Sequence, residues 1–481
     1  MLWMQTIHTS RGSSPSLLRR SSKTTTTIVA TLLNFSTNSC YISPTHSFLL
    51  TTIGFPKPNF HQQQQQQQAS HSLSFFSSYH RSKSTASTST AMNMIHGKTF
   101  VSVEDAIALH PSSSSSSSSS EKSDKNVVFV DGSWFLPTLG RNGKEEFLEG
   151  PRIEGAKFLD IDDIATPTTS EGGQQLPHMM PSNDLFSKWM DTMEITTNDH
   201  VIVYGSKECP FVSRAFWNVR TFHPPNQCHL LDGSLQDWID ANGPIEEKGT
   251  EPKCPIVTAS QLSSSSLEPK YKPRSIDPKN NIVDLDKVKQ SIENGSVVKN
   301  VASGDDSSSE SMVIVDARSN GRFIAVADEP RPGLREGHMP GKKNSLLYMA
   351  CYRVPDSTLD GASSLYFSYH YVHRPPSPLK KTKGAINIPF NSLLQESNVN
   401  RYLPREDLVT ILEKNGLVSD NGKGNKTRIV SSCGSGVTAS CLLVALTSVI
   451  GPDRVDDVAY LYDGSWIEWG GDKDTPVVTE D

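Results

Sequence analysis

Four short features of the sequence occur twice, in the same order, and this duplication restricts the possible folds more than any other property of the chain. From the second feature to the fourth the spacing is nearly equal in both copies: 77 residues from Gly155 to Asp232, and 79 from Gly384 to Asp463. The paired features are residues 127–131 with 312–316, 155–158 with 384–388, 201–204 with 428–431, and 231–234 with 462–465. Such a repeat predicts two structural units with one fold.

The pattern within each copy indicates the fold class. Short β-branched runs alternate with helix-length segments at 184–193, 213–222, 405–415 and 438–450. That alternation is typical of βα units around a parallel sheet. We therefore predict an α/β protein with two tandem domains, each a mostly parallel central sheet flanked by helices. One large α/β domain with chance internal echoes is the alternative.

Changes in composition predict the domain boundaries. We expect a disordered targeting segment at 1–95, a first domain at 96–245 with a polyserine surface loop at 112–120, a linker at 246–280, and a second domain at 281–475. The first segment has no Asp or Glu before Glu104 and is rich in Ser, Thr and basic residues. This composition predicts a transit peptide, for mitochondria first and plastids second. A plain disordered tail is the alternative, and a start at Met92 or Met94 would yield a cytosolic form.

The second copy contains a surplus of residues between Asp316 and Gly384. Asp131 to Gly155 is 24 residues and Asp316 to Gly341 is 25, so the register is kept up to Gly341. The surplus is therefore an insertion at 341–383, which is 43 residues long. Two explanations stay open. The insertion is a surface loop, or it is a translated intron, because the codons for Gly341 and Lys342 can contain a consensus 5′ splice signal.

The most specific local feature is a cysteine at the end of a β-branched run, in the sequence Ser432-Cys433-Gly434-Ser435-Gly436. An apolar helix-length segment follows at once. A helix N-terminus favours thiolate over thiol, and the two glycines allow backbone N–H groups to turn inward around an anion. Cys433 is thus the predicted nucleophile. Cys441, inside the apolar segment, is predicted to be a core residue.

Composition excludes several functional classes. The net charge of −6 provides no bulk attraction to nucleic acid, and no apolar run reaches the ~18 residues of a membrane span. The seven cysteines are scattered and include no Cys-x-x-Cys pair, so we expect no metal site and no disulfide framework, and we predict no cofactor.

Several motifs resemble the tandem rhodanese-domain family of 3-mercaptopyruvate and thiosulfate sulfurtransferases. These motifs are residues 131–137, 158–162 and 176–179 in the first copy, and 315–323, 329–333, 337–341, 433–438 and 463–469 in the second. The resemblance covers about residues 95 to 475 apart from the linkers. It implies that Cys433 carries sulfur as a persulfide.

The resemblance also implies roles for other residues. Arg322 and Arg331 would hold the substrate's carboxylate and keto oxygen, as guanidinium forks can. Asp162, His178 and Ser435 would form a polar relay for protons. Asp162 and His178 are about five residues further apart here than in the family, which weakens the assignment of His178. The loop residues Gly434, Gly436, Val437 and Thr438 would line the substrate site.

The same resemblance implies the reaction and its partners. A small-molecule donor, 3-mercaptopyruvate, would pass sulfur to Cys433 and leave as pyruvate, and thioredoxin, dihydrolipoate, another thiol or cyanide would accept it. Thiosulfate-preferring members carry Arg and Lys directly after the cysteine, where this chain has Gly434 and Ser435. The alternatives are a thiosulfate:cyanide sulfurtransferase, or a sulfur relay for tRNA thiolation or cofactor biosynthesis.

Two other readings of the cysteine loop are disfavoured. A tyrosine phosphatase of this fold class needs an Arg six residues after the cysteine, and that position is Ala439. A non-catalytic binding module has no need of an intact cysteine loop. In the repeat register, Gly205 of the first copy stands where the second has Cys433, so the first domain is predicted to be non-catalytic. Cys209 is predicted to be a surface or packing cysteine.

Overall fold

The structure is a computed structural model that describes residues 88–113, 126–266, 268–274, 281–298, 311–341, 384–418 and 427–479. The expected targeting segment, apart from its last residues, lies outside this range, as do most of the polyserine run and residues 342–383 of the insertion. Everything below concerns the unit that runs from Ser84 to Asp481.

The first sheet has five parallel strands in the order β1-β8-β7-β2-β4. They are β1 (Phe100–Ser102), β8 (Cys228–Asp232), β7 (His200–Tyr204), β2 (Val127–Asp131) and β4 (Lys157–Phe158). The central strand β7 is buried at all five positions, which explains its continuous apolar run rather than an alternating one.

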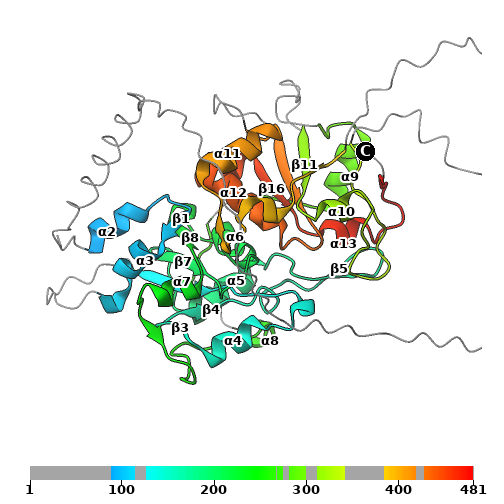
Figure 1. The fold of residues 1–481 in the computed structure, drawn as a ribbon. Coiled ribbons are helices and arrows are strands. Elements are labelled where there is room, and N and C mark those ends of the chain that lie inside the picture. The colour runs from blue at the N-terminus through cyan, green and yellow to red at the C-terminus, as the bar shows by residue number, and fades with distance from the viewer. Residues whose placement is uncertain are drawn as a thin grey trace, which may run out of the picture. The chain divides into compact units, whose positions relative to one another are not determined.

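The second sheet repeats this topology in the order β10-β16-β15-β11-β12, again with parallel pairs. Its strands are β10 (Ile282–Val283), β16 (Ala459–Tyr462), β15 (Arg428–Ser432), β11 (Met312–Asp316) and β12 (Ile386–Asn387). Because each sheet places the duplicated features on equivalent strands, the prediction of an α/β fold used twice is confirmed (Figure 1).

Helices cover both sheets. The four expected helices are present as α5 (Asn183–Thr192), α6 (Val212–Phe222), α11 (Arg405–Lys414) and α12 (Ala439–Ile450), each within one residue of the predicted start. The others are α2 (Thr88–Ile95), α3 (Val103–Leu109), α4 (Gly143–Glu149), α7 (Leu235–Asp240), α8 (Ala259–Ser264), α9 (Leu285–Glu293), α10 (Asn320–Phe323) and α13 (Ser465–Trp469). Among the described residues no helix has the length and apolarity needed to cross a bilayer.

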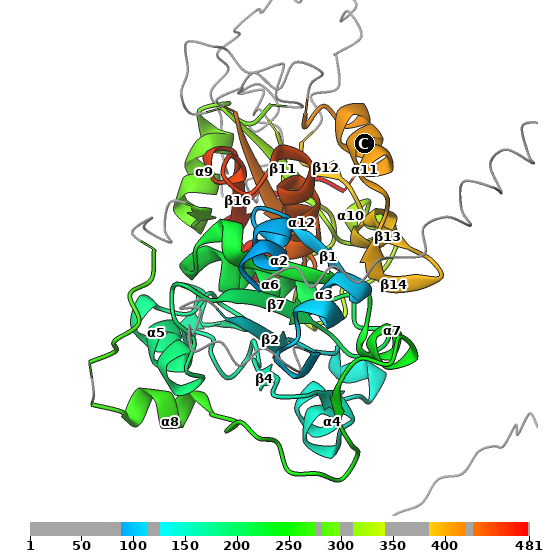
Figure 2. The same cartoon turned by 90° about the vertical axis from the view of Figure 1, so that its left-hand side faces the viewer.

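The two sheets are connected by a pair of equivalent helices. Each of α6 and α12 follows the central strand of its own sheet, and the two helices contact one another (Figures 1 and 2). One apolar cluster includes buried residues of both, from Val212 to Leu446. Every residue of α6 is buried, including Arg214 and Arg220. The helix therefore contributes polar side chains to a region without solvent.

Three short antiparallel pairs project from the sheets. They are β3 (Arg152–Ile153) with β9 (Ile245–Glu246), β5 (Thr168–Thr169) with β6 (Gln175–Leu176), and β13 (Leu394–Gln395) with β14 (Asn398–Tyr402). The pair β5–β6 belongs to the long segment between Asp162 and His178. Its turn reaches the second domain, because Gln174 lies against Gly471.

Three segments near the expected boundaries have defined places. Helix α2 lies inside the expected 1–95 segment, and its Met92 and Ile95 are buried. Within the expected linker, Leu262 of α8 and Tyr271 are buried in the main apolar cluster. The ends of the insertion lie against each other: the N–H of Ala385 donates to the Met339 carbonyl at 3.0 Å. The boundaries themselves stay predictions.

Candidate active site

Cys433 directly follows the central strand β15 and is only 2% exposed. Its backbone is held by the start of α13: the Cys433 N–H donates to Ser465 Oγ at 3.2 Å, and the Trp466 N–H donates to the Cys433 carbonyl at 3.0 Å. The Ile467 N–H likewise donates to the Gly434 carbonyl. The loop is thus anchored through the Cys433 N–H and through two carbonyl groups, which leaves the N–H groups of residues 434–438 available.

The available N–H groups form the anion site that the sequence predicted. The amides of residues 434–438 have no hydrogen-bond partner among the described residues. Gly436 has a φ of +82°, in the left-handed region where glycine is favoured. Gly434 lies close to the second domain's arginine, since a Cβ there would be 3.2 Å from Arg322 Nη2 and would require that side chain to shift slightly. Five consecutive unpaired amides before the N-terminus of α12 can stabilise a thiolate or a persulfide anion.

The two predicted substrate arginines differ in their environments. Arg322 pairs with Glu329, with Nη2 and Oε2 2.5 Å apart, and Glu329 is also held by Arg318. Arg331 has no hydrogen bond or ion pair with any described residue. Burial lowers the pKa of Arg331, and the charges that act on it include those of Cys433, Arg322 and Asp162. Arg331 is therefore the arginine free to bind an anion beside the cysteine.

Asp162 and His178 are brought together despite the long segment between them. His178 Nδ1 hydrogen-bonds Asp162 Oδ1, and Trp134 Nε1 donates to Asp162 Oδ2 at 2.8 Å. Burial raises the pKa of Asp162, but the bonds with His178 and Trp134 outweigh it and hold that pKa below its ordinary value. His178 is 6% exposed, so it is not the exposed loop histidine that its unusual spacing made conceivable.

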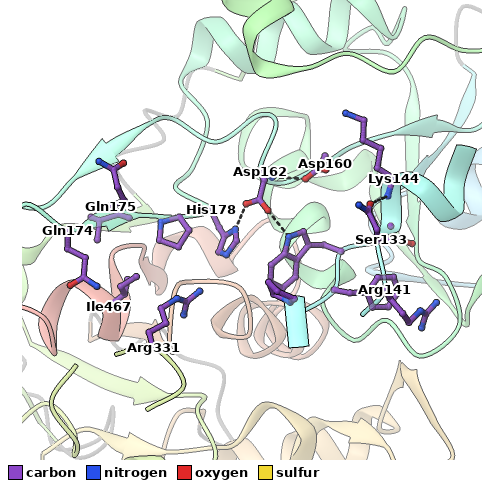
Figure 3. Close-up of a pocket in the computed structure, with 17 residues that line it drawn as sticks. Ser133, Arg141, Lys144, Asp160, Asp162, Gln174, Gln175, His178, Arg331 and Ile467 are labelled. Atoms are coloured by element: carbon purple, nitrogen blue, oxygen red, sulfur yellow. Dashed lines mark hydrogen bonds and ion pairs between the residues drawn. The ribbon is translucent and has the colours of Figure 1, made fainter. Parts of the chain in front are cut away.

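These residues border one cavity of about 860 Å³. Figure 3 shows Asp162 and His178 on its wall, with Arg331 directed toward His178 from the second domain. Ile467 lines the cavity too, whereas Cys433 and Ser435 do not. No hydrogen bond joins Ser435 to His178 within the described residues, so the third member of the expected relay is not connected to the other two.

Sequence reasoning missed three residues that organise the site: Glu329, Arg214 and Asp463. Glu329 orients Arg322, as described above. Arg214 of α6 is fully buried and forms an ion pair with Asp463, with Nη2 and Oδ1 2.8 Å apart. Glu329 and Asp463 both stood inside motifs that were recognised as such. Arg214 carried no signal, because an arginine in a helix of this kind is ordinarily exposed.

Two other cysteines, Cys209 and Cys441, have quite different surroundings from those of Cys433. Cys209 and Cys441 are fully buried, and burial raises the pKa of each thiol to about 12. Both are packing residues, so for Cys209 the packing alternative holds rather than the surface one. A sheet used twice, with a cysteine loop whose amides lack partners among the described residues, agrees with the resemblance to rhodanese-type sulfurtransferases.

Comparisons with known proteins agree with this class. No family model matches the chain. The chain is 25% identical over 440 residues to thiosulfate/3-mercaptopyruvate sulfurtransferase 1, mitochondrial, of Arabidopsis thaliana, covering 90% of this chain and 95% of that protein. It is 27% identical over 355 residues to 3-mercaptopyruvate sulfurtransferase of Escherichia coli, covering 74% of this chain and 92% of that protein. The crystal structure of the Tum1 protein from Saccharomyces cerevisiae has the same fold, with a TM-score of 0.52, 22% identity and coverage of 80% and 99%.

The resemblance to 3-mercaptopyruvate and thiosulfate sulfurtransferases is confirmed over most of the chain, and the chain is an enzyme similar to them.

Proposed function

We propose that the enzyme transfers sulfur from 3-mercaptopyruvate to a thiol acceptor through a persulfide on Cys433. The observation that carries this proposal is the set of five unpaired amides next to the buried Cys433. A thiolate and a persulfide are both anions, and both need the stabilisation that such amides and a helix N-terminus provide.

The charges near the cysteine support a monoanionic keto acid as the donor. Gly434 and Ser435 are neutral. The cation assigned to bind the donor is Arg331, whose charge acts on Cys433 and which has no hydrogen-bond or ion-pair partner within the described residues. One guanidinium can bind a carboxylate through two hydrogen bonds. A dianion such as thiosulfate would gain from additional positive charge, which Arg322 cannot fully supply while it neutralises Glu329.

The reaction proceeds in two transfers. The Cys433 thiolate attacks the sulfur of 3-mercaptopyruvate, an S–S bond forms, and the C–S bond breaks. The electron pair of that bond moves to the carbon, which takes up a proton to give pyruvate. We assign the donation of that proton to His178, which is held by Asp162 and lines the cavity. An acceptor thiolate then attacks the outer sulfur, and the Cys433 thiolate leaves.

The acceptor and the location belong to the same proposal. A dithiol such as thioredoxin or dihydrolipoate would take the sulfur and release it as sulfide by closing its own disulfide. The Arabidopsis thaliana relative is named as mitochondrial, which supports the mitochondrial reading of the N-terminal composition.

A donor comparison tests the proposal. Purified enzyme is mixed with 3-mercaptopyruvate or with thiosulfate, and a dithiol is present in each case. We expect pyruvate and sulfide in stoichiometric amounts from 3-mercaptopyruvate, with a higher kcat/KM than for thiosulfate. A clear preference for thiosulfate would assign the other activity in this family, and no turnover of either donor would contradict the proposal.

A further inference from the structure

We infer that Arg214 is a positioning residue that holds the His178 segment of the first domain against the cysteine loop of the second. This inference rests on the proposed function. It concerns a buried arginine on α6 that does not line the cavity.

The Arg214 guanidinium contacts both halves of the site at once. Nη1 donates to the Gly436 carbonyl of the cysteine loop at 3.2 Å. Nη2 donates to the His178 carbonyl and to Asp463 Oδ1, the latter at 2.8 Å. Three acceptors from separate segments thus surround one guanidinium. A lysine ammonium, a compact point charge on a flexible stem, has no planar fork to match them.

Asp463 completes the link from the other side. Its Oδ2 accepts the N–H of Met180 at 2.6 Å, two residues beyond His178. The chain around His178 is therefore fixed at two points, and both bonds end in the Arg214–Asp463 pair. Removal of either partner would leave the other charge buried and unpaired.

The cysteine loop is shaped around the same pair. A Cβ at Gly436 would lie 3.0 Å from Arg214 Nη1 and 3.1 Å from Asp463 Oδ1. The charge of Arg214 also lowers the pKa of Asp162, the partner of His178. Arg214 thus acts on the geometry of the loop and on the electrostatics around His178, while it does not line the cavity and has no hydrogen bond with Cys433 among the described residues.

The chain provides a matched control six residues further along α6. Arg220 is also buried and also bridges the two domains, with Nη1 2.6 Å from Asp456 Oδ1 and Nη2 2.7 Å from the Pro452 carbonyl. Neither acceptor belongs to the active site. Arg214→Met and Arg220→Met each remove a buried ion pair between the domains, although Asp456 keeps Arg274, with Nη1 and Oδ2 2.6 Å apart. Only the first variant should affect chemistry beyond its effect on stability.

The experiment measures kcat, KM and thermal unfolding for wild type, Arg214→Met, Arg214→Lys and Arg220→Met with 3-mercaptopyruvate. We expect both Met variants to lose stability, Arg214→Met more than Arg220→Met, because Asp456 keeps its pair with Arg274. Only Arg214→Met should lower kcat, by about 10- to 150-fold, the range for loss of a charge-assisted contact, with KM little changed because Arg331 is intact. Arg214→Lys should recover only part of the loss.

Asp463→Asn provides a second route if Arg214→Met does not fold, since it preserves the shape of the partner. It should also lower kcat, and the double variant with Arg214→Lys should lose less than the sum of the single effects. Equal kcat losses in Arg214→Met and Arg220→Met, or a rise in KM without a fall in kcat, would overturn the inference. A wild type without turnover would instead refute the proposed function.

Discussion

The two domains contain the same strand–loop–helix unit, and only one of the two loops is left open. Sheet register makes Tyr204 and Ser432 equivalent, because each is paired with the aspartate that ends the neighbouring strand. Gly205 therefore corresponds to Cys433. The fourth residues of the loops, Glu208 and Gly436, both have positive φ, at 61° and 82°. The backbone shape is thus shared, although the residues differ.

The two loops differ in the hydrogen-bond partners of their backbone N–H groups. In the first domain the Ser206 N–H donates to Ser133 Oγ at 2.7 Å, and the Cys209 N–H donates to Asn400 Oδ1 at 3.2 Å. In the second domain the corresponding amides have no partner within the described residues. The comparison teaches that the fold presents backbone amides after its central strand, and that side chains from elsewhere cap two of them in the first domain and, among the described residues, none of the corresponding ones in the second.

The largest expected effect is the loss of turnover when the cysteine of the second loop, but not that of the first, is replaced. Cys433→Ser should abolish turnover with every donor and leave thermal unfolding unchanged, because a serine hydroxyl is a near-isosteric but much weaker nucleophile. Cys209→Ser is the matched variant and should retain activity. Steady-state kinetics check both variants. Loss of activity in Cys209→Ser alone would show that the catalytic cysteine is in the first domain and not in the second.

The next effect concerns Arg331, whose charge acts on Cys433 in the second loop. Arg331→Ala should raise KM for 3-mercaptopyruvate by about 10- to 150-fold, since a charge-assisted contact contributes roughly 1.5–3 kcal/mol. Arg322→Ala should raise KM as well, but it should also lower stability because Glu329 loses one of its two arginines. Arg141→Ala, at another part of the cavity, is the control. An unchanged KM in Arg331→Ala would rule out the carboxylate contact.

A smaller effect, a loss of stability, is expected from a change at the first-domain loop, where Asn400 bonds with the backbone. Asn400→Ala should leave the Cys209 N–H and the Ser206 carbonyl without their partner, which costs about 1–3 kcal/mol for a buried polar group. Activity per folded molecule should not change, because Asn400 contacts only the first loop. Chemical denaturation provides the stability, and kinetics on the same sample provide the activity. A fall in kcat without a loss of stability would show that the two loops are coupled.

The smallest effect is expected from removal of residues 341–383. A Cβ on Gly384 would lie 2.9 Å from the Pro340 carbonyl carbon, so the chain can be rejoined where the first domain is continuous. The shortened enzyme should keep its activity and be at least as stable, since each halving of a loop saves about 0.6 kcal/mol of closure entropy. Transcript sequencing decides between the two origins: mature messages that all contain these codons exclude an intron.

Much of the fold followed from local patterns. Repeated strands, turns and helix-length segments specified the two sheets, and the Cys-Gly-Ser-Gly sequence located the open loop, because both depend on neighbours in the chain. The pairing of His178 with Asp162 was implied only by family resemblance. Arg214 was not predicted at all, since its three acceptors come from distant segments, and a sequence does not indicate which buried surface will meet which charge.

The most direct test of the account is the intact mass of the enzyme after brief incubation with 3-mercaptopyruvate and removal of the excess donor. We predict a species heavier by one sulfur atom, with the added atom located by peptide mapping on Cys433 and released by a dithiol together with the return of the original mass. No added sulfur on wild type, or sulfur carried on Cys209 instead, would contradict the claim that the open loop of the second domain is the sulfur carrier.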